Sequence, residues 1–435
     1  MGDNSHHNLK RLIFRGASGA AGLNAASTLL ALVSGVLLAR ALGPDNYGLY
    51  VFVLSLITIL GLPTNAGLPF LVVRETAKNF LYKRWGLLRG LLRQANLVVV
   101  CFSLLIGLSV VGVMQLTDIG GDWNGVEPLS WALLLLPIVA LGNIRGATLR
   151  GFKKAFRGQL PEQLVKPLSL VLLLSVFIVL DKDLTPHLAI LLNLVSALLA
   201  FFVGVWLLRS TLPPPLVNAK PEYEHRAWIS SLVPLSMIAA MKLIDTQVVV
   251  LLLGSLASID NVALFRVAAQ GATLVAFGLT AVNLVLAPHV TTLYQEGRME
   301  ELQNLVTFAT RIAFAIAVPV AIVLIVFGKP IVAWVFGEEY IEASLSLGIL
   351  SIGQLINVSA GSVVVILNMA GYERETFKAL FLAALVSITL TVVLVPLWQA
   401  VGAAFAVIAS LSIWNVMMMR SVNRHIGLKT FVLAR

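Results

Sequence analysis

Twelve apolar stretches, arranged as two sets of six, constrain this chain more than any other feature. They lie near residues 16–39, 47–73, 95–116, 129–149, 159–180, 184–208, 229–254, 261–288, 306–328, 343–369, 377–396 and 399–419. Each is close to the ~20 residues that cross a ~30 Å hydrocarbon layer as a helix. With 58% hydrophobic and 12% charged residues, a soluble core could not hold them all. The sequence predicts an all-α polytopic membrane protein with about 12 transmembrane helices.

A turn that recurs in both halves indicates a duplication. Residues 41–50 read ALGPDNYGLY, and residues 255–265 read SLASIDNVALF, about half the chain later. Pro69 and Pro288 close the next stretch of each half at nearly the same spacing. Duplicated membrane bundles of this kind are typical of transporters, whose substrate site lies between the repeats. We therefore expect two six-helix bundles around a central cavity.

The longest polar break inside the chain is expected to join the halves. It contains Pro213, Pro214 and Pro215, which favour a stiff extended spacer. The expected parts are an N-terminal six-helix half over residues 1–208, a cytoplasmic linker over 209–228 and a C-terminal six-helix half over 229–435. Since six is even, the second half re-enters the membrane from the same face, and the halves are related by an axis along the membrane normal.

The net charge of +10 follows the pattern of a membrane protein. All but five of the 31 Lys and Arg residues lie in segments expected on one face: before the first stretch, after the last, and in or next to alternate connections. By the positive-inside rule, both termini are cytoplasmic, which requires an even number of spans. The distribution predicts a multi-pass protein without a nucleic-acid partner. The five exceptions are Arg40, Lys182, Lys242, Arg266 and Lys329.

Several kinds of chemistry are excluded by the rare residue types. Cys101 is the only cysteine, so no intrachain disulfide or thiolate cluster forms. The six histidines are scattered, and none has a metal-ligand neighbour at helical spacing. We expect no metal site, no cofactor and no catalytic residue, and the outward loops are too short to hold a catalytic domain.

Helix breakers are concentrated in the second stretch. Gly61, Pro63, Gly67 and Pro69 leave backbone groups there without helical partners. Such backbone is tolerated at membrane depth only where protein or a water-filled cavity covers it. The segment is either a hinge or cavity wall, or a kink packed against a neighbouring helix.

Three ionisable side chains lie in the seventh and eighth stretches. Lys242 and Asp245 share a helix face, and Arg266 lies within their reach if the chain turns near Ser258. A charge at the bilayer centre costs at least ~2.5–3.5 kcal/mol, so these groups should face the bundle interior. One interpretation is an anion site in which Asp245 positions the cations or couples transport to an ion. The alternative is a salt-bridge network that locks the hairpin.

Other polar side chains extend this candidate site. Arginine matches phosphate oxygens bidentately, although snorkelling to the interface is the alternative role. Amides can bind sugar hydroxyls, although hydrogen bonding between helices is the alternative. The candidates for the headgroup or diphosphate are Lys242, Arg266, Arg145, Arg40 and Arg74; the coupling candidate is Asp245; the sugar-contact candidates are Asn24, Asn65, Gln270 and Asn357.

The residues around the first turn resemble a known family. LLARALGPDNYGLY at residues 37–50, followed by GLPFLVVRE at 67–75, is similar to the start of the bacterial polysaccharide-repeat flippases. These are the O-antigen and exopolysaccharide exporters of the multidrug, oligosaccharidyl-lipid and polysaccharide transporter superfamily. VFGEEY at 335–340 resembles the short outer segment after their ninth span. The matching positions are Arg40, Asp45, Tyr47, Gly48 and Arg74.

The resemblance implies a flippase of the bacterial cytoplasmic (inner) membrane. It implies that undecaprenyl-diphosphate-linked oligosaccharide repeat units cross that membrane by alternating access, for polysaccharide biosynthesis and export. A cationic cavity would take the diphosphate and sugar while the lipid tail stays in the bilayer. The implied partners are the lipid-linked oligosaccharide, membrane lipids, and the polysaccharide polymerase and chain-length machinery.

Two other functions stay open. A multidrug or small-molecule cation antiporter of the same superfamily would need carboxylates inside the first half, whereas the first stretch contains none. A membrane-embedded glycosyltransferase or ligase would need a catalytic acid or base near a polar loop. The acids of residues 117–128 are candidates for that role, although the loop is small.

Overall fold

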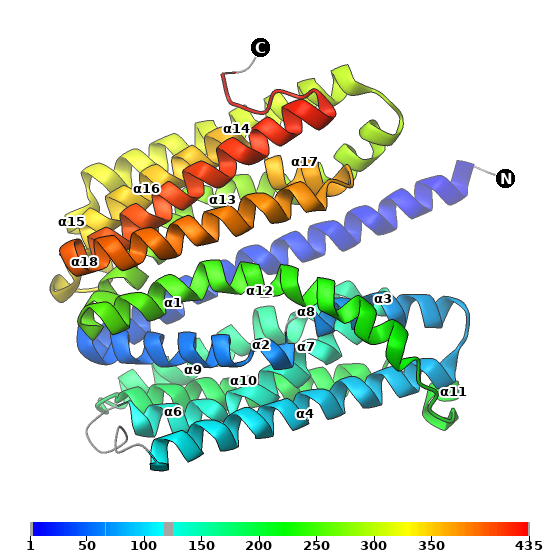
Figure 1. Ribbon diagram of the computed structural model, residues 1–435, viewed down its shortest axis with the longest axis horizontal. Coiled ribbons are helices and arrows are strands. Elements are labelled where there is room, and N and C mark those ends of the chain that lie inside the picture. The colour runs from blue at the N-terminus through cyan, green and yellow to red at the C-terminus, as the bar shows by residue number, and fades with distance from the viewer. Residues whose placement is uncertain (1–2, 66, 117–124, 434–435) are drawn as a thin grey trace. The chain divides into compact units, whose positions relative to one another are not determined.

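The computed structural model describes residues 3–65, 67–116 and 125–433, and within these ranges the chain forms helices and no strand (Figure 1). The helices before the middle of the chain are α1 (Asp3–Leu60), α2 (Leu62–Asn65), α3 (Leu68–Leu81), α4 (Trp85–Leu116), α6 (Val126–Leu133), α7 (Leu135–Gly151), α8 (Ala155–Leu160), the π-helix η1 (Pro161–Val165), α9 (Lys166–Val179), α10 (Pro186–Arg209) and α11 (Pro214–Asn218). The later helices are α12 (His225–Leu256), α13 (Ile259–Gln295), α14 (Met299–Val326), α15 (Gly328–Val335), the 3₁₀-helix η2 (Glu338–Tyr340), α16 (Ala343–Ala360), α17 (Val363–Met369) and α18 (Glu373–Ile426).

Nine helical segments of the described ranges are long and apolar enough to cross a membrane. The longest of these segments, α18, has 54 residues, and α1 has 58 residues in all, of which Gly22–Leu60 is the candidate span. A continuous helix of that length would extend about 80 Å, far more than one crossing needs. It contains one non-helical residue, Gln399, just as α1 contains Gly43, so each consists of two helices joined at a kink. The all-α polytopic fold is confirmed, while the number of twelve spans stays a prediction.

The described chain divides into two compact units. The first contains Met1–Leu42 and Val53–Leu243, and the second contains Gly43–Phe52 and Ile244–Arg435. A segment from early in the chain therefore belongs to the later unit. The expected boundaries of the halves and linker stay predictions.

The proline run does not form an extended spacer throughout. Pro213 is extended, but Pro214 and Pro215 begin the short helix α11. Proline is tolerated there because the first N–H groups of a helix have no partner within the helix.

Small residues on α7 let neighbouring helices approach closely in the first unit. A Cβ atom on Gly146 would lie 2.6 Å from the carbonyl oxygen of Gly158 on α8. A Cβ atom on Gly151 would lie 2.5 Å from Cβ of Thr76 on α3. Close backbone approach at small residues is typical of membrane helix packing. It places α7 against α3, α4, α8 and α10, in the middle of the unit.

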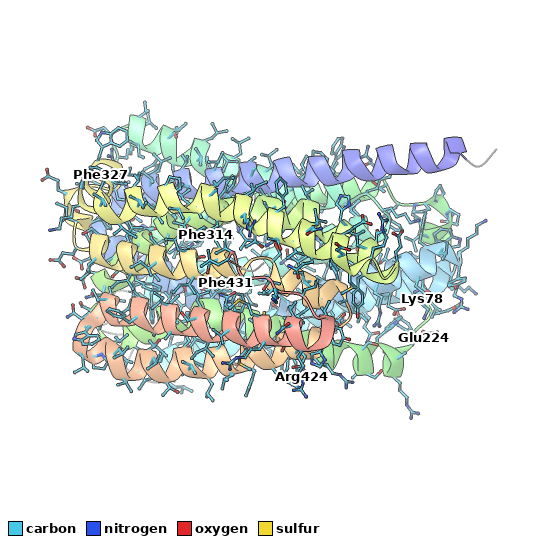
Figure 2. The ribbon with its side chains drawn as sticks, turned by 90° about the horizontal axis from the view of Figure 1, so that it is seen from above. Lys78, Glu224, Phe314, Phe327, Arg424 and Phe431 are labelled. Atoms are coloured by element: carbon cyan, nitrogen blue, oxygen red, sulfur yellow. The ribbon has the colours of Figure 1, made fainter. Side chains whose placement is uncertain are left out.

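In the second unit, α13, α14, α16 and α18 pack side by side (Figure 1). Figure 2 shows Phe327, which follows α14, and Arg424, in the last turn of α18, toward opposite ends of this unit. The segment Gly43–Phe52 joins it through Gly48, where a Cβ atom would overlap the carbonyl oxygen of Ile259. Only glycine fits at this contact.

Candidate functional site

A cavity of about 220 Å³ lies inside the first unit, where the second apolar stretch breaks. Gly61 and Asn65 form part of its wall, and the Thr64 hydroxyl donates to Gly61 O at 2.7 Å, alongside the backbone N–H groups of Thr64 and Asn65. Gly67, with φ 75°, packs against Ser236. The break thus forms a cavity wall and also a packed kink. The cavity is lined by Leu54, Ile57, Thr58, Gly61, Thr64, Asn65, Leu135, Leu136, Val139, Ala140, Lys166, Asn193 and Leu243.

Lys166 is the one charged side chain among the described residues that line this cavity. It lies near the middle of the candidate span Ala155–Val179 and follows the π-helix η1. The Lys166 N–H donates to Pro161 O, five residues earlier, which is the hydrogen bond of a π turn, and Pro167 has no N–H to donate to the carbonyl of Gln163. Such turns occur frequently at functional sites. The local sequence therefore interrupts the helix where the lysine meets the cavity.

The ammonium of Lys166 forms no ion pair with a carboxylate in the part of the chain that the structure describes. Glu162, one turn earlier, interacts with it electrostatically. The Glu162 Oε1 lies over Gly142 on α7, where a Cβ atom would come within 2.5 Å of it. Glu162 is therefore seated between helices and is not among the cavity-lining residues.

Amide groups complete the polar side of the cavity. Asn143 Nδ2 on α7 donates to Asn65 Oδ1 at 3.1 Å, which fixes Asn65 at the wall. Asn193 on α10 is buried. A lysine ammonium offers three donors, and at about 30 Å³ per water the cavity holds several water molecules. This arrangement can bind a small anion or an anionic part of a larger substrate.

Arg145, the predicted headgroup residue on α7, lies outside the cavity lining. Its guanidinium carbon is 3.7 Å from the centroid of the Phe201 ring on α10, a cation–π contact. Its Nη1 is buried and has no hydrogen-bond partner among the described residues. Arg209, at the end of α10, acts on it as a neighbouring like charge. Two cations therefore lie close together in this unit.

The predicted residues Arg74, Arg40 and Asn24 of the first unit are not among the residues that line the cavity. Arg74 pairs with the buried Glu75, with Nη2 at 3.1 Å from Oε1, and Lys78 also reaches Glu75. Figure 2 shows Lys78 at the same end of the unit as Glu224. Arg40 is exposed on α1, and Asn24 is half-buried there. Of the predicted candidates, Asn65 lines the cavity.

In the second unit, the guanidinium of Arg266 interacts electrostatically with the hydroxyl of the buried Tyr47. The Tyr47 ring packs edge-on against Tyr340, with centroids 6.4 Å apart. Burial, together with Tyr47, Glu339 and Asp45, raises the pKa of Tyr340, so this phenol stays protonated. The motif residues thus build a tyrosine cluster next to Arg266.

Two amide candidates of the second unit differ in their surroundings. Asn357 Oδ1 on α16 accepts a hydrogen bond from Asn415 Nδ2 on α18 at 3.2 Å, and its Nδ2 donates to Gln354 Oε1 at 3.4 Å. This is a bond between helices. Gln270 is half-buried on α13.

Lys242 and Asp245 lie on α12, but their side chains are outside the described residues. Their predicted roles, like those of the other candidates, stay predictions.

The comparisons with known proteins decide the family. Residues 13–294, more than half of the chain, match the family of polysaccharide biosynthesis proteins. The chain belongs to this family. No curated protein matches it.

The family member shares its fold with solved transporters. An inward-facing multidrug resistance MATE family transporter of the MOP superfamily has a TM-score of 0.76 at 15% identity, over 92% of this chain and 94% of that one. The lipid II flippase MurJ, in an inward closed conformation, has a TM-score of 0.72 at 13% identity, over 95% and 87%. A MOP superfamily transporter from Pyrococcus furiosus, described as having a binding pocket of reverse polarity, has a TM-score of 0.63 at 15% identity, over 95% of both chains. This family member therefore has the fold of these transporters, and its long apolar helices make it a multi-pass membrane protein.

Lys166 was not among the residues that the sequence singled out. It was counted with the basic residues of a cytoplasmic connection, because Arg145, Arg150 and Arg157 come shortly before it. The signal that reveals it is its position inside the apolar stretch 159–180, between Pro161 and Pro167.

Proposed function

We propose that this protein is a flippase that moves undecaprenyl-diphosphate-linked oligosaccharide repeat units across the bacterial cytoplasmic membrane. The match to polysaccharide biosynthesis proteins over residues 13–294 carries this proposal, because that family serves glycan assembly. The fold shared with a lipid II flippase is consistent with a lipid-linked substrate. In the proposed orientation, both termini are cytoplasmic.

The charge of the cavity supports an anionic substrate. Among the described residues that line the cavity there is a lysine and no carboxylate. A diphosphate at membrane depth needs cationic donors, and charge-assisted hydrogen bonds are roughly twice as strong as neutral ones. Lys166 is therefore added to the proposed headgroup residues. The earlier candidates keep their proposed roles: Lys242, Arg266, Arg145, Arg40 and Arg74 for the diphosphate, Asp245 for coupling, and Asn24, Asn65, Gln270 and Asn357 for sugar.

The proposed cycle is alternating access of the two bundles around a central cavity, with the lipid tail in the bilayer. The substrate would be passed on to polysaccharide polymerase and chain-length machinery. A cation antiporter is the second candidate, favoured by the TM-score of 0.76 to a multidrug resistance transporter. The lysine in the cavity disfavours cationic drugs.

The decisive experiment measures transbilayer movement of a labelled undecaprenyl-diphosphate oligosaccharide in liposomes containing the purified protein. We expect movement with the wild type and its loss in the double variant Lys242→Gln with Arg266→Gln. The matched control is Lys182→Gln with Lys329→Gln, which removes two exposed charges and should keep the activity. Absence of movement for several glycans in folded wild-type protein would overturn the proposal and make cation efflux the next assay.

A further inference from the structure

A second cavity, of about 450 Å³, lies where the segment between α10 and α12 crosses the start of α4. Arg89 and Arg93 on α4 and Lys220 on the crossing segment supply three cations, and Asn96 and Asn218 supply amides. No carboxylate is among the described residues that line it. Figure 1 shows α11, part of this segment, beside the start of α4. We call this site the basic pocket.

The crossing segment is seated firmly on α4. The Glu222 N–H donates to Gly86 O at 2.9 Å, and Arg89 Nη1 donates to Ala219 O at 2.6 Å. A Cβ atom on Gly90 would overlap the carbonyl oxygen of Glu222, so the two backbones touch. These contacts hold Lys220 on the same side of α4 as the arginines. The basic pocket is therefore formed by backbone that is fixed in place.

The cations of the basic pocket are not neutralised by protein carboxylates. Arg93 and Lys220 form no ion pair within the described ranges. The Glu222 carboxylate lies over Gly86, a turn nearer the start of α4 than Arg89. The pocket therefore keeps a positive charge that an external anion can satisfy.

The face of α4 that carries these arginines continues as an exposed apolar stripe. Leu97, Leu104 and Leu108 follow Arg93 at helical spacing and are 62%, 60% and 72% exposed. In a candidate span such side chains face lipid. From Arg93 to Leu108 the helix rises about 22 Å, enough for the acyl chains of one leaflet of a ~30 Å core. Cations at the headgroup level and an apolar stripe beneath them match a phospholipid.

We propose that the basic pocket binds the phosphate headgroup of an anionic phospholipid, whose acyl chains lie along the leucine stripe of α4. Basic pockets beside membrane helices bind anionic headgroups by this combination of charge and depth. The bound lipid would clamp the segment between α10 and α12 onto α4. This inference goes beyond the proposed flippase activity and does not depend on its substrate.

The test is lipid binding to the purified full-length chain in neutral detergent, measured by native mass spectrometry. The probes are palmitoyl-oleoyl phosphatidylglycerol, phosphatidylcholine with the same chains, and inorganic phosphate. We expect the wild type to retain phosphatidylglycerol over phosphatidylcholine. Arg93→Gln with Lys220→Gln should lower that affinity about 30-fold, since each cation contributes about a fivefold factor near a charged headgroup. Arg374→Gln with Arg424→Gln removes two exposed charges elsewhere and should leave it unchanged.

A third variant separates a lipid from a free anion. Leu97→Asn with Leu104→Asn should weaken phosphatidylglycerol binding and leave phosphate binding unchanged. Equal retention of phosphatidylcholine, an equal loss in the Arg374 and Arg424 control, or phosphate binding as tight as that of the lipid would each overturn the proposal. If the Arg93 and Lys220 variant loses its helical content, Lys220→Gln alone is measured, and unchanged affinity in that variant also overturns it.

Discussion

The two units hold their cations at membrane depth in different ways. Lys166 in the first unit faces a cavity and forms no ion pair with the described carboxylates. Arg266 in the second unit lies beside Tyr47, which packs against Tyr340. Arg266 is exposed but interacts with a buried phenol of the fold, whereas Lys166 faces a cavity. The comparison teaches that the motif residues Tyr47 and Gly48 contribute to packing, and that a candidate ligand contact, Lys166, lies outside the motif.

The strongest way to break this comparison is to disrupt the motif. Gly48→Val should destabilise the protein by about 3 kcal/mol or more, because the new side chain would overlap the backbone of Ile259. Thermal unfolding and the yield of monodisperse protein measure this effect. Gly107→Val, on α4 where a Cβ atom meets nothing within 4 Å, is the control and should change little. Normal stability of the Gly48 variant would show that the motif does not serve the fold.

The next largest effect is expected at the cavity. Lys166→Gln should lower the initial rate of substrate movement in liposomes about 10- to 100-fold, the value of a charge-assisted hydrogen bond. Its stability should be unchanged or raised, because a charge inside the membrane is removed. Lys182→Gln, at an exposed position, is the control. Normal transport together with lower stability in the Lys166 variant would show that this lysine has a structural role and does not bind substrate.

The amide pair of the second unit provides a smaller contrast. Asn357→Leu should cost about 1–3 kcal/mol, because one N–H of the buried Asn415 amide loses its acceptor while the other keeps its bond to Leu411 O. Asn24→Leu, at a half-buried position, should cost less. Chemical denaturation in detergent measures both. An equal cost for the two variants would argue against a special role of the bond between α16 and α18.

The smallest expected effect concerns Arg145. Phe201→Leu removes the ring beneath its guanidinium and should cost about 1 kcal/mol, in the range of a cation–π contact. The midpoint of thermal unfolding measures this change, with Phe202→Leu at the exposed neighbouring position as the control. If the two variants shift the unfolding midpoint equally, the cation–π contact of Arg145 does not contribute to stability.

Much of the architecture follows from local patterns in the sequence. Apolar length alone predicts a polytopic helical protein, and the breakers from Gly61 to Pro69 predict either a hinge or cavity wall or a packed kink, without deciding between them. The contact of Tyr47 with Arg266 was beyond such patterns, since it joins residues from opposite halves of the chain. Lys166 was missed because a basic residue near a span end and one inside it look alike when the boundary is uncertain by a few residues.

The membership of Gly43–Phe52 in the second unit bears on how the protein is made. Gly48 leaves the ribosome roughly 200 residues before its partner Ile259. At a synthesis rate of about 5–20 residues per second, this contact forms on the order of 10–40 s after Gly48 is made. Throughout this interval the first hairpin must rest in the membrane with a docking surface still uncovered. Co-expressed halves divided in the linker should therefore depend on each other to mature, since neither contains all the pieces of its own bundle.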